Sequence, residues 1–204
     1  RLRGEGRNSS ELYRSLGTLY QVQGRFDDAE PLFRKAAEGY EASTGEHPET
    51  AKTYSRYGQM RFAQGDLKDA ERLLSKAMAM FEKKAPWHPE AAGTLHHLGV
   101  LHAAQGRLAD ADAEFRKALS LREKSLGSKH PDVGATASQL GRLCQQQMKL
   151  DMAEPFLKLA LEIDEAVLGA EHPATAASLT ALAELRLTQA KPEDAQKLML
   201  RVLS

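Results

Sequence analysis

One phrase recurs five times along the chain, and it limits the folds that the chain can adopt. Each copy is a nine-residue segment whose second position is Gly in four copies and Ala in the fifth, and a second Ala-led phrase follows each one. Such self-similarity indicates an array of small units that bury their apolar faces against one another. The marker residues, spaced by 41, 41, 42 and 42 positions, are Gly17, Gly58, Gly99, Gly141 and Ala183.

The spacing within each phrase predicts α-helices. Leu95, Leu98, Gly99 and His102 fall at i, i+3, i+4 and i+7, which places them on one face of a helix, and the second phrases show the same period. We therefore expect an all-α fold of five antiparallel helix pairs in one domain. The repeats are expected at about residues 9–46, 47–87, 88–129, 130–171 and 172–204.

Short turns should join the two helices of each pair. Gly24, Gly65 and Gly106 stand where a residue after a helix adopts a positive φ, a conformation that suits glycine. Met148 and Ala190 occupy the same place in the last two repeats. Because neither is glycine, we expect those two turns to be shaped differently.

A His-Pro dipeptide lies between successive repeats. Proline fits the first turn of a helix, so each dipeptide marks the start of the next repeat. The histidines are too far apart along such an array to share a metal ion, and His102 occupies a core position, so we expect no metal site. The dipeptides are His47-Pro48, His88-Pro89, His130-Pro131 and His172-Pro173.

Composition excludes several classes of function. Lys plus Arg and Asp plus Glu both number 28, so no basic excess draws the chain to nucleic acid or to a membrane surface. The single cysteine, Cys144, excludes an internal disulfide and is expected to be a buried packing thiol. This usage fits an intracellular, cytoplasmic setting. No membrane-spanning run or catalytic motif is present, no cofactor is expected, and the start at Arg1 indicates a fragment of a longer protein.

The repeat resembles the tetratricopeptide repeat, and the longer period with linkers such as Leu126–Pro131 (LGSKHP) is similar to the kinesin light chain subgroup. The resemblance implies a right-handed superhelical solenoid whose first helices line a concave face that binds peptides or partner helices. The residues of the first repeat that carry it are Leu16, Gly17, Tyr20, Ala29, Phe33 and Ala36.

Carried over by position, the concave face has more cations than acids, which predicts an acidic peptide or helix as partner. The asparagine ladder of kinesin light chains is absent, since Ser15, Arg56, His97, Gln139 and Ala181 stand in its place. Their cargo specificity is therefore not implied, and the carboxylate clamp of chaperone-binding members is absent too. The predicted partner-binding residues are Arg14, Thr18, Lys52, Arg56, Gln59, His96, His97, Gln139, Arg142, Gln146 and Glu184.

The leading prediction is a non-catalytic interaction scaffold. One alternative is a self-assembling array, because Leu198, Met199 and Val202 in the last helix would lack a following helix to cover them. Another is the substrate-recruiting arm of an enzyme whose catalytic domain lies outside this segment. Trp87, in the linker Pro86–Pro89, either covers neighbouring helix ends or anchors a partner.

Overall fold

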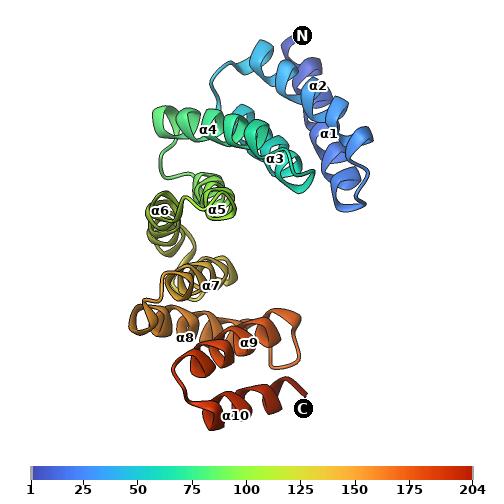
Figure 1. Cartoon of the computed structure of the whole chain (residues 1–204). Helices are drawn as coiled ribbons and strands as arrows, with labels where there is room; N and C mark the ends of the chain where they lie inside the picture. The colour runs from blue at the N-terminus through green and yellow to red at the C-terminus, as the bar shows by residue number, and fades with distance from the viewer. Residues whose placement is uncertain (1, 204) are drawn as a thin grey trace. The chain divides into compact units, whose positions relative to one another are not determined.

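The computed structural model describes residues 2–203, with side chains described for residues 9–202. Within that range the chain forms ten α-helices and no strand, which confirms the all-α prediction (Figure 1). The helices are α1 (Leu2–Val22), α2 (Phe26–Thr44), α3 (Pro48–Ala63), α4 (Leu67–Lys84), α5 (Pro89–Ala104), α6 (Leu108–Leu126), α7 (Pro131–Gln146), α8 (Leu150–Val167), α9 (Pro173–Thr188) and α10 (Pro192–Leu203).

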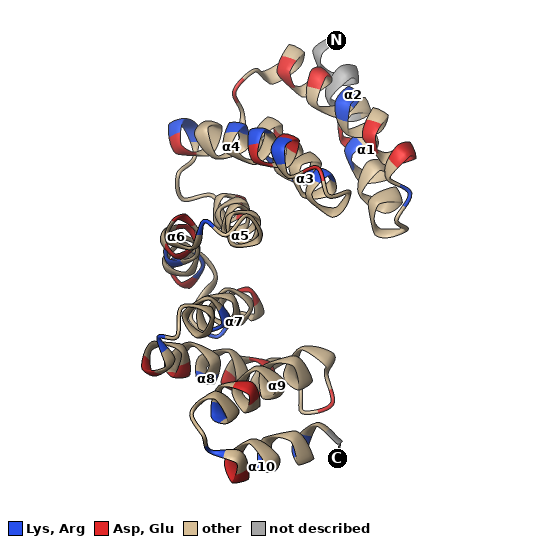
Figure 2. Cartoon of the chain, in the orientation of Figure 1, with Lys and Arg blue, Asp and Glu red and all other residues tan. Residues whose placement is uncertain are grey.

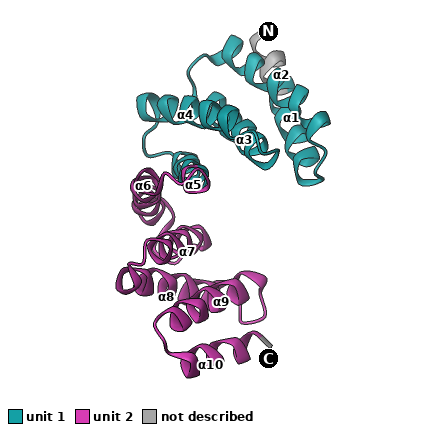
Figure 3. Cartoon of the chain, viewed as in Figure 1, with its two compact units in different colours: residues 1–101 teal, residues 102–204 magenta. Residues whose placement is uncertain are grey.

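The contacts divide the chain into two compact units, residues 1–101 and 102–204 (Figure 3). In unit 1, α1 packs on α2 and α3 packs on α4, and α2 also packs on α3. In unit 2 the hairpins are α7 with α8 and α9 with α10, while α6 packs on α7 and α8 packs on α9. Each unit is thus a stack of antiparallel helix pairs, as the repeats predict.

The repeated glycines are packing contacts between the two helices of a hairpin. A Cβ atom at Gly58 would lie 2.8 Å from Cγ of Leu74, and one at Gly141 would lie 2.5 Å from Cδ2 of Leu157. Real Cβ atoms do not approach a neighbour this closely, so only glycine allows these helices their spacing. In the last hairpin Ala183 stands at this place and is fully buried.

The turns at Met148 and Ala190 correct the sequence prediction. Both residues have a positive φ, of 58° and 57°, close to the 86° of Gly65. The hydrogen bonds match as well: the N–H of Lys149 donates to the carbonyl of Cys144, as that of Asp66 donates to Arg61. The hairpin geometry therefore dictates one turn shape in every repeat, and the non-glycine residues accept the backbone strain.

The linker histidines cap the helices that follow them. In each linker the imidazole Nδ1 accepts a hydrogen bond from the backbone N–H two residues later, at 3.1–3.2 Å. An N-terminal helix turn leaves N–H groups without partners inside the helix, and a side-chain acceptor satisfies one of them. The His-Pro dipeptide is thus a cap followed by the first helical residue, at His47, His88, His130 and His172.

One position near the end of each second helix is buried against the start of the next repeat, and its chemistry varies. It lies eleven residues after the leading Ala of the second phrase and is occupied by Tyr40, Phe81, Arg122 and Asp164. All four are at most 7% exposed. The guanidinium of Arg122 donates to the carbonyl of Asp132, at 2.7 Å, and to the hydroxyl of Thr136. The carboxylate of Asp164 accepts from Ser178 at 2.6 Å.

The last helix is less open than the sequence predicts. Leu198 and Val202 pack against the core of unit 2, which includes Leu157 and Leu182, because both face α8 and α9. Met199 points elsewhere and is 40% exposed. The prediction of three uncovered side chains is therefore wrong for Leu198 and Val202.

Candidate functional site

Four of the predicted partner-binding residues lie together in one cleft of unit 1. The cleft, of about 350 Å³, lies between α1 and α3. Lys52 and Arg56 line the same cleft from successive turns of α3, which confirms that they point the same way. The lining residues are Arg14, Ser15, Thr18, Lys52 and Arg56.

Arg14 is held in place inside the cleft. Its guanidinium lies 2.6 Å from a carboxylate oxygen of Glu49 and 5.2 Å from the centre of the Tyr40 ring, and the residue is only 8% exposed. Burial alone would raise the pKa of Glu49, but the hydrogen bond from Arg14 and the positive charges of Arg14 and Lys52 together outweigh it and lower that pKa. Arg14 is therefore a largely compensated charge that stiffens the cleft wall.

The other two cations differ in their partners. The ammonium of Lys52 lies 3.2 Å from a carboxylate oxygen of Glu90. Arg56 is half-buried and forms no ion pair with any side chain that the structure describes. The cleft thus holds three cations but only one without a carboxylate partner, which gives it an excess of about one positive charge.

The remaining predicted residues of unit 1 lie outside this cleft. The amide of Gln59 donates to the hydroxyl of Ser55 at 3.3 Å. His96 and His97 on α5 are half-buried, with their rings edge to face and 5.5 Å apart. These three side chains engage their own neighbours.

The predicted residues of unit 2 lie on the first helices of its hairpins. Gln139, Arg142 and Gln146 belong to α7, and Glu184 belongs to α9. Gln139 is half-buried and the other three are exposed. None of the four lines the cleft of unit 2 that is formed by Leu108, Ala109, Asp112, Gln147 and Lys149.

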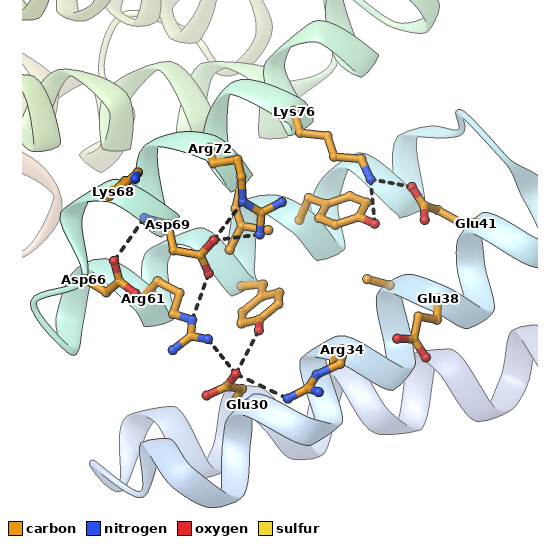
Figure 4. A pocket seen from close by; sticks show the side chains of 14 residues that line it. Glu30, Arg34, Glu38, Glu41, Arg61, Asp66, Lys68, Asp69, Arg72 and Lys76 are labelled. Atoms are coloured by element: carbon orange, nitrogen blue, oxygen red, sulfur yellow. Dashed lines mark hydrogen bonds and ion pairs between the residues drawn. The ribbon is translucent and has the colours of Figure 1, made fainter.

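A larger cleft, of about 960 Å³, separates the two hairpins of unit 1 along α2, α3 and α4 (Figure 4). Acidic and basic residues both occur along α4 (Figure 2). Arg61 reaches from α3 to Glu30 at 2.5 Å and to Asp69 at 3.0 Å. Lys76 on α4 contacts Glu41 on α2 at 2.6 Å. The cleft is crossed by ion pairs that join the two hairpins.

The same ion pairs recur in unit 2, which identifies their role. Arg186 and Glu154 occupy the positions of Arg61 and Glu30, and they are bonded at 2.8–2.9 Å. Arg201 pairs with Glu165 as Lys76 pairs with Glu41. Because the contact recurs between successive hairpins in both units, we interpret it as a structural device and assign the larger cleft no binding role. The sequence analysis did not predict these ion pairs. Their residues occupy equivalent positions in different repeats, and this recurrence could have indicated them.

The side chains that could ligate a metal or react chemically are dispersed or buried in the described part of the chain. Among the side chains described, no group of three or more His, Cys, Asp or Glu residues is placed to hold a metal ion. His102 is buried as predicted, with its Nδ1 2.8 Å from a carboxylate oxygen of Glu114, and burial raises the pKa of that carboxyl. Cys144 is buried too, and burial raises the pKa of its thiol.

The structure also shows how exposed Trp87 is and whether any described helix could span a membrane. Trp87 is 69% exposed, so it covers little of its surroundings. In the part of the chain that is described, none of the helices combines the length and apolar character needed to cross a bilayer.

Stacked antiparallel hairpins with a short glycine-type turn in each define the class of helical-repeat proteins. The sequence matches the tetratricopeptide repeat family over residues 8–83, 90–166 and 132–204. The chain belongs to this family, and its fold is typical of protein–protein interaction scaffolds. No curated protein matches the sequence.

Solved structures confirm the resemblance to kinesin-light-chain-like repeats. The TPR-like repeats of a kinesin-light-chain-like protein from Podosopora anserina share 26% identity and a TM-score of 0.77, over 95% of this chain and 94% of that one. BtubC (BKLC) from P. vanneervenii shares 17% identity and a TM-score of 0.82, over 98% and 87%. PilF of Pseudomonas aeruginosa shares 20% identity and a TM-score of 0.70, over 95% and 75%. The last two show the fold alone.

Proposed function

We propose that the chain is a non-catalytic interaction module that binds an acidic peptide or helix of a partner protein. The observation that supports the proposal most directly is the convergence of Arg14, Thr18, Lys52 and Arg56 in one cleft between α1 and α3. Arg56 is the main contact, since its charge is the one that no carboxylate offsets. Gln59, His96, His97, Gln139, Arg142, Gln146 and Glu184 are proposed as further contacts along the first helices.

The net charge of the α1–α3 cleft favours a ligand that places a single carboxylate there. Glu49 and Glu90 already neutralise Arg14 and Lys52, so a side chain with one negative charge matches the excess best. The hydroxyls of Ser15 and Thr18 lie in the same cleft and supply polar contacts for a peptide. Opposite charges speed association and disfavour basic competitors, while the helices are already folded before a ligand arrives.

The test is peptide binding at low and high salt. The probes are fluorescein-labelled peptide pools with Glu or Asp at alternate positions, and a matched pool with Lys at the same positions. We expect only the acidic pools to bind, and Arg56→Glu to weaken their binding by about 1–2 kcal/mol, roughly five- to thirtyfold. Binding should also fall as salt rises, because partly exposed charges are screened within about 8–10 Å.

The matched control is Lys117→Glu, which makes the same reversal at an exposed site on α6. It should leave the affinity unchanged, and circular dichroism should show both variants fully helical. Equal binding of acidic and basic pools, or equal affinity of Arg56→Glu and the wild type, would refute the α1–α3 cleft as the binding site.

A further inference from the structure

The turn between α7 and α8 differs from the equivalent turns of the other repeats by two exposed methionines. Met148 stands at the positive-φ position, which is glycine in the first three repeats and Ala190 in the last, and it is 69% exposed. Met152, 46% exposed, stands four residues later, where the other repeats have aspartate. Helices α6 and α9 pack on this hairpin, so the exposure of its turn does not follow from where the sequence begins or ends. The replaced aspartates correspond to Asp28, Asp69, Asp110 and Asp194.

The second methionine deprives a lysine of its usual partner. In two other turns, the cation that precedes the second helix forms an ion pair with the aspartate three residues later. These pairs are Arg25 with Asp28, at 2.7 Å, and Arg107 with Asp110, at 2.8 Å. Lys149 holds the cation's position before α8, but Met152 stands in place of the aspartate. Lys149 is exposed and forms no ion pair with any side chain that the structure describes.

A cleft of about 660 Å³ lies between this turn and the start of α6. Gln147 and Lys149, which flank Met148 in the chain, line it from the turn. Leu108 and Ala109 line it from the first turn of α6, and Ala109 stands where the other repeats have a charged residue. A cleft of about 300–1,000 Å³ is large enough to enclose a ligand side chain. Its walls are therefore partly apolar and of a suitable size for binding.

The net charge of this cleft is positive. Asp112 also lines it, but its carboxylate accepts a hydrogen bond from the guanidinium of Arg116 at 2.8 Å and is thereby neutralised. Lys149 thus contributes the charge that no described carboxylate offsets. It lies at the N-terminus of α8, where the helix dipole also favours an anion. The position vacated by aspartate is therefore complementary to a carboxylate supplied from outside the chain.

We infer that this turn and the start of α6 form a second protein-binding surface, which takes a partner segment with an apolar residue next to Glu or Asp. The apolar side chain enters the cleft beside Leu108 and Ala109, and the carboxylate pairs with Lys149. Unbranched methionine side chains adapt to apolar partners of varied shape. Binding also gives a role to Met148, a side chain held at a strained positive φ. The surface is separate from the α1–α3 cleft and does not rest on the proposed function.

The location of binding is tested by NMR of the chain labelled with ¹³C at its methionine methyl groups. The probes are short Gly-Ser peptides that carry a central Leu-Glu, Leu-Lys or Ser-Glu pair. The Leu-Glu peptide alone should shift the methyl resonances of Met148 and Met152, while that of the fully buried Met60 stays unchanged. Measurements in an Arg56→Glu background, which disables the α1–α3 cleft, should give the same shifts. The two binding proposals can therefore fail separately.

The affinity is measured by fluorescence anisotropy with a labelled Leu-Glu peptide. The double variant Met148→Gly, Met152→Asp restores the residues of the other repeats and returns a carboxylate to Lys149, so it should fold and bind about tenfold or more weakly. Lys149→Glu should lose the Leu-Glu peptide and bind the Leu-Lys peptide instead, because the charge of the surface is reversed.

The control is Val22→Asp, which replaces an exposed apolar residue near the turn of the α1–α2 hairpin in unit 1. It should bind like the wild type, and circular dichroism should confirm that every variant is folded. Unchanged Met148 and Met152 resonances in the presence of the Leu-Glu peptide overturn the inference. So does a double variant that binds as tightly as the wild type, or a Lys149→Glu variant that keeps its preference for the Leu-Glu peptide.

Discussion

The two units solve the same packing problem with opposite chemistry. Where the second helix meets the next repeat, unit 1 buries the aromatic rings of Tyr40 and Phe81, whereas unit 2 buries the charged groups of Arg122 and Asp164. The ring of Phe81 stacks on His88, with ring centres 5.4 Å apart. The charged groups instead receive hydrogen bonds from, or donate them to, the following helix. At this position the fold requires a side chain long enough to contact the next repeat, and either an aromatic or a charged side chain satisfies that requirement.

The largest expected loss of stability comes from removing the aromatic ring at this junction in unit 1. Phe81→Ala should lower the free energy of unfolding by about 3–5 kcal/mol, because it removes a fully buried ring and leaves a cavity. Urea denaturation followed by circular dichroism measures the loss. Trp87→Ala, six residues further on and exposed, should change stability by less than about 0.5 kcal/mol. Similar losses for the two variants would contradict the assignment of Phe81 to the core.

At the charged junction, replacing Arg122 should cost less stability than replacing Phe81, and an apolar side chain should be able to take its place. Arg122→Ala should cost about 2–3 kcal/mol, because it removes the donor to the Asp132 carbonyl and to Thr136. Arg122→Met should recover most of that loss, since it fills the space as Phe81 does and Thr136 keeps its own 3.0 Å bond to Asp132. If the methionine variant is as unstable as the alanine variant in urea, the two chemistries are not interchangeable.

The ion pairs between hairpins allow a test by pH. Hydrogen bonding from Arg186 holds the pKa of Glu154 well below its value of 4.5 in an unfolded chain. Because the folded-state pKa is depressed, the stabilisation is fully present above pH 4.5 and is lost as the pH falls below it. Solvent reaches this pair, so the stabilisation is at most about 1 kcal/mol. Thermal melts of Glu154→Gln should therefore depend less on pH between about 6 and 3 than those of the wild type.

The control for that measurement is Glu162→Gln, which removes an exposed carboxylate from the same helix. An identical reduction of acid sensitivity in both variants would assign the effect to net charge and not to the contact with Arg186.

The smallest expected change in stability comes from substitutions in the turns of the two units. Met148→Gly should raise stability by about 0.5–1 kcal/mol, because glycine adopts the positive φ of this turn without the strain of a side chain. Gly65→Ala should lower it by a similar amount, since no atom lies near the added Cβ and only the φ of 86° opposes the change. Both differences should appear as opposite shifts in the urea midpoint. Shifts of the same sign would show that the turns differ after all.

Periodicity made the helices, the hairpins and the glycine contacts predictable, because each follows from spacing along one chain. It also predicted that Lys52 and Arg56 share a face. It did not reveal that Glu49 and Glu90 neutralise Arg14 and Lys52, since those pairs depend on side-chain reach between helices. The turn at Met148 was mispredicted for a similar reason: residue preference suggested a new shape, but packing of the hairpin imposed the old one.

The close approach of Gly58 to Leu74 and of Gly141 to Leu157 bears on how such a chain changes length over generations. The spacing from this marker position to the following Ala is twelve residues in all five repeats, as from Gly58 to Ala70. The step from 41 to 42 residues falls instead between Ala111 and Gly141, the stretch that contains the linker around His130. An insertion inside a hairpin would move a side chain into the glycine's place, whereas a linker absorbs it as a longer loop. The repeats of this chain thus differ in length in the stretch that contains the linker, and keep one length inside the hairpin.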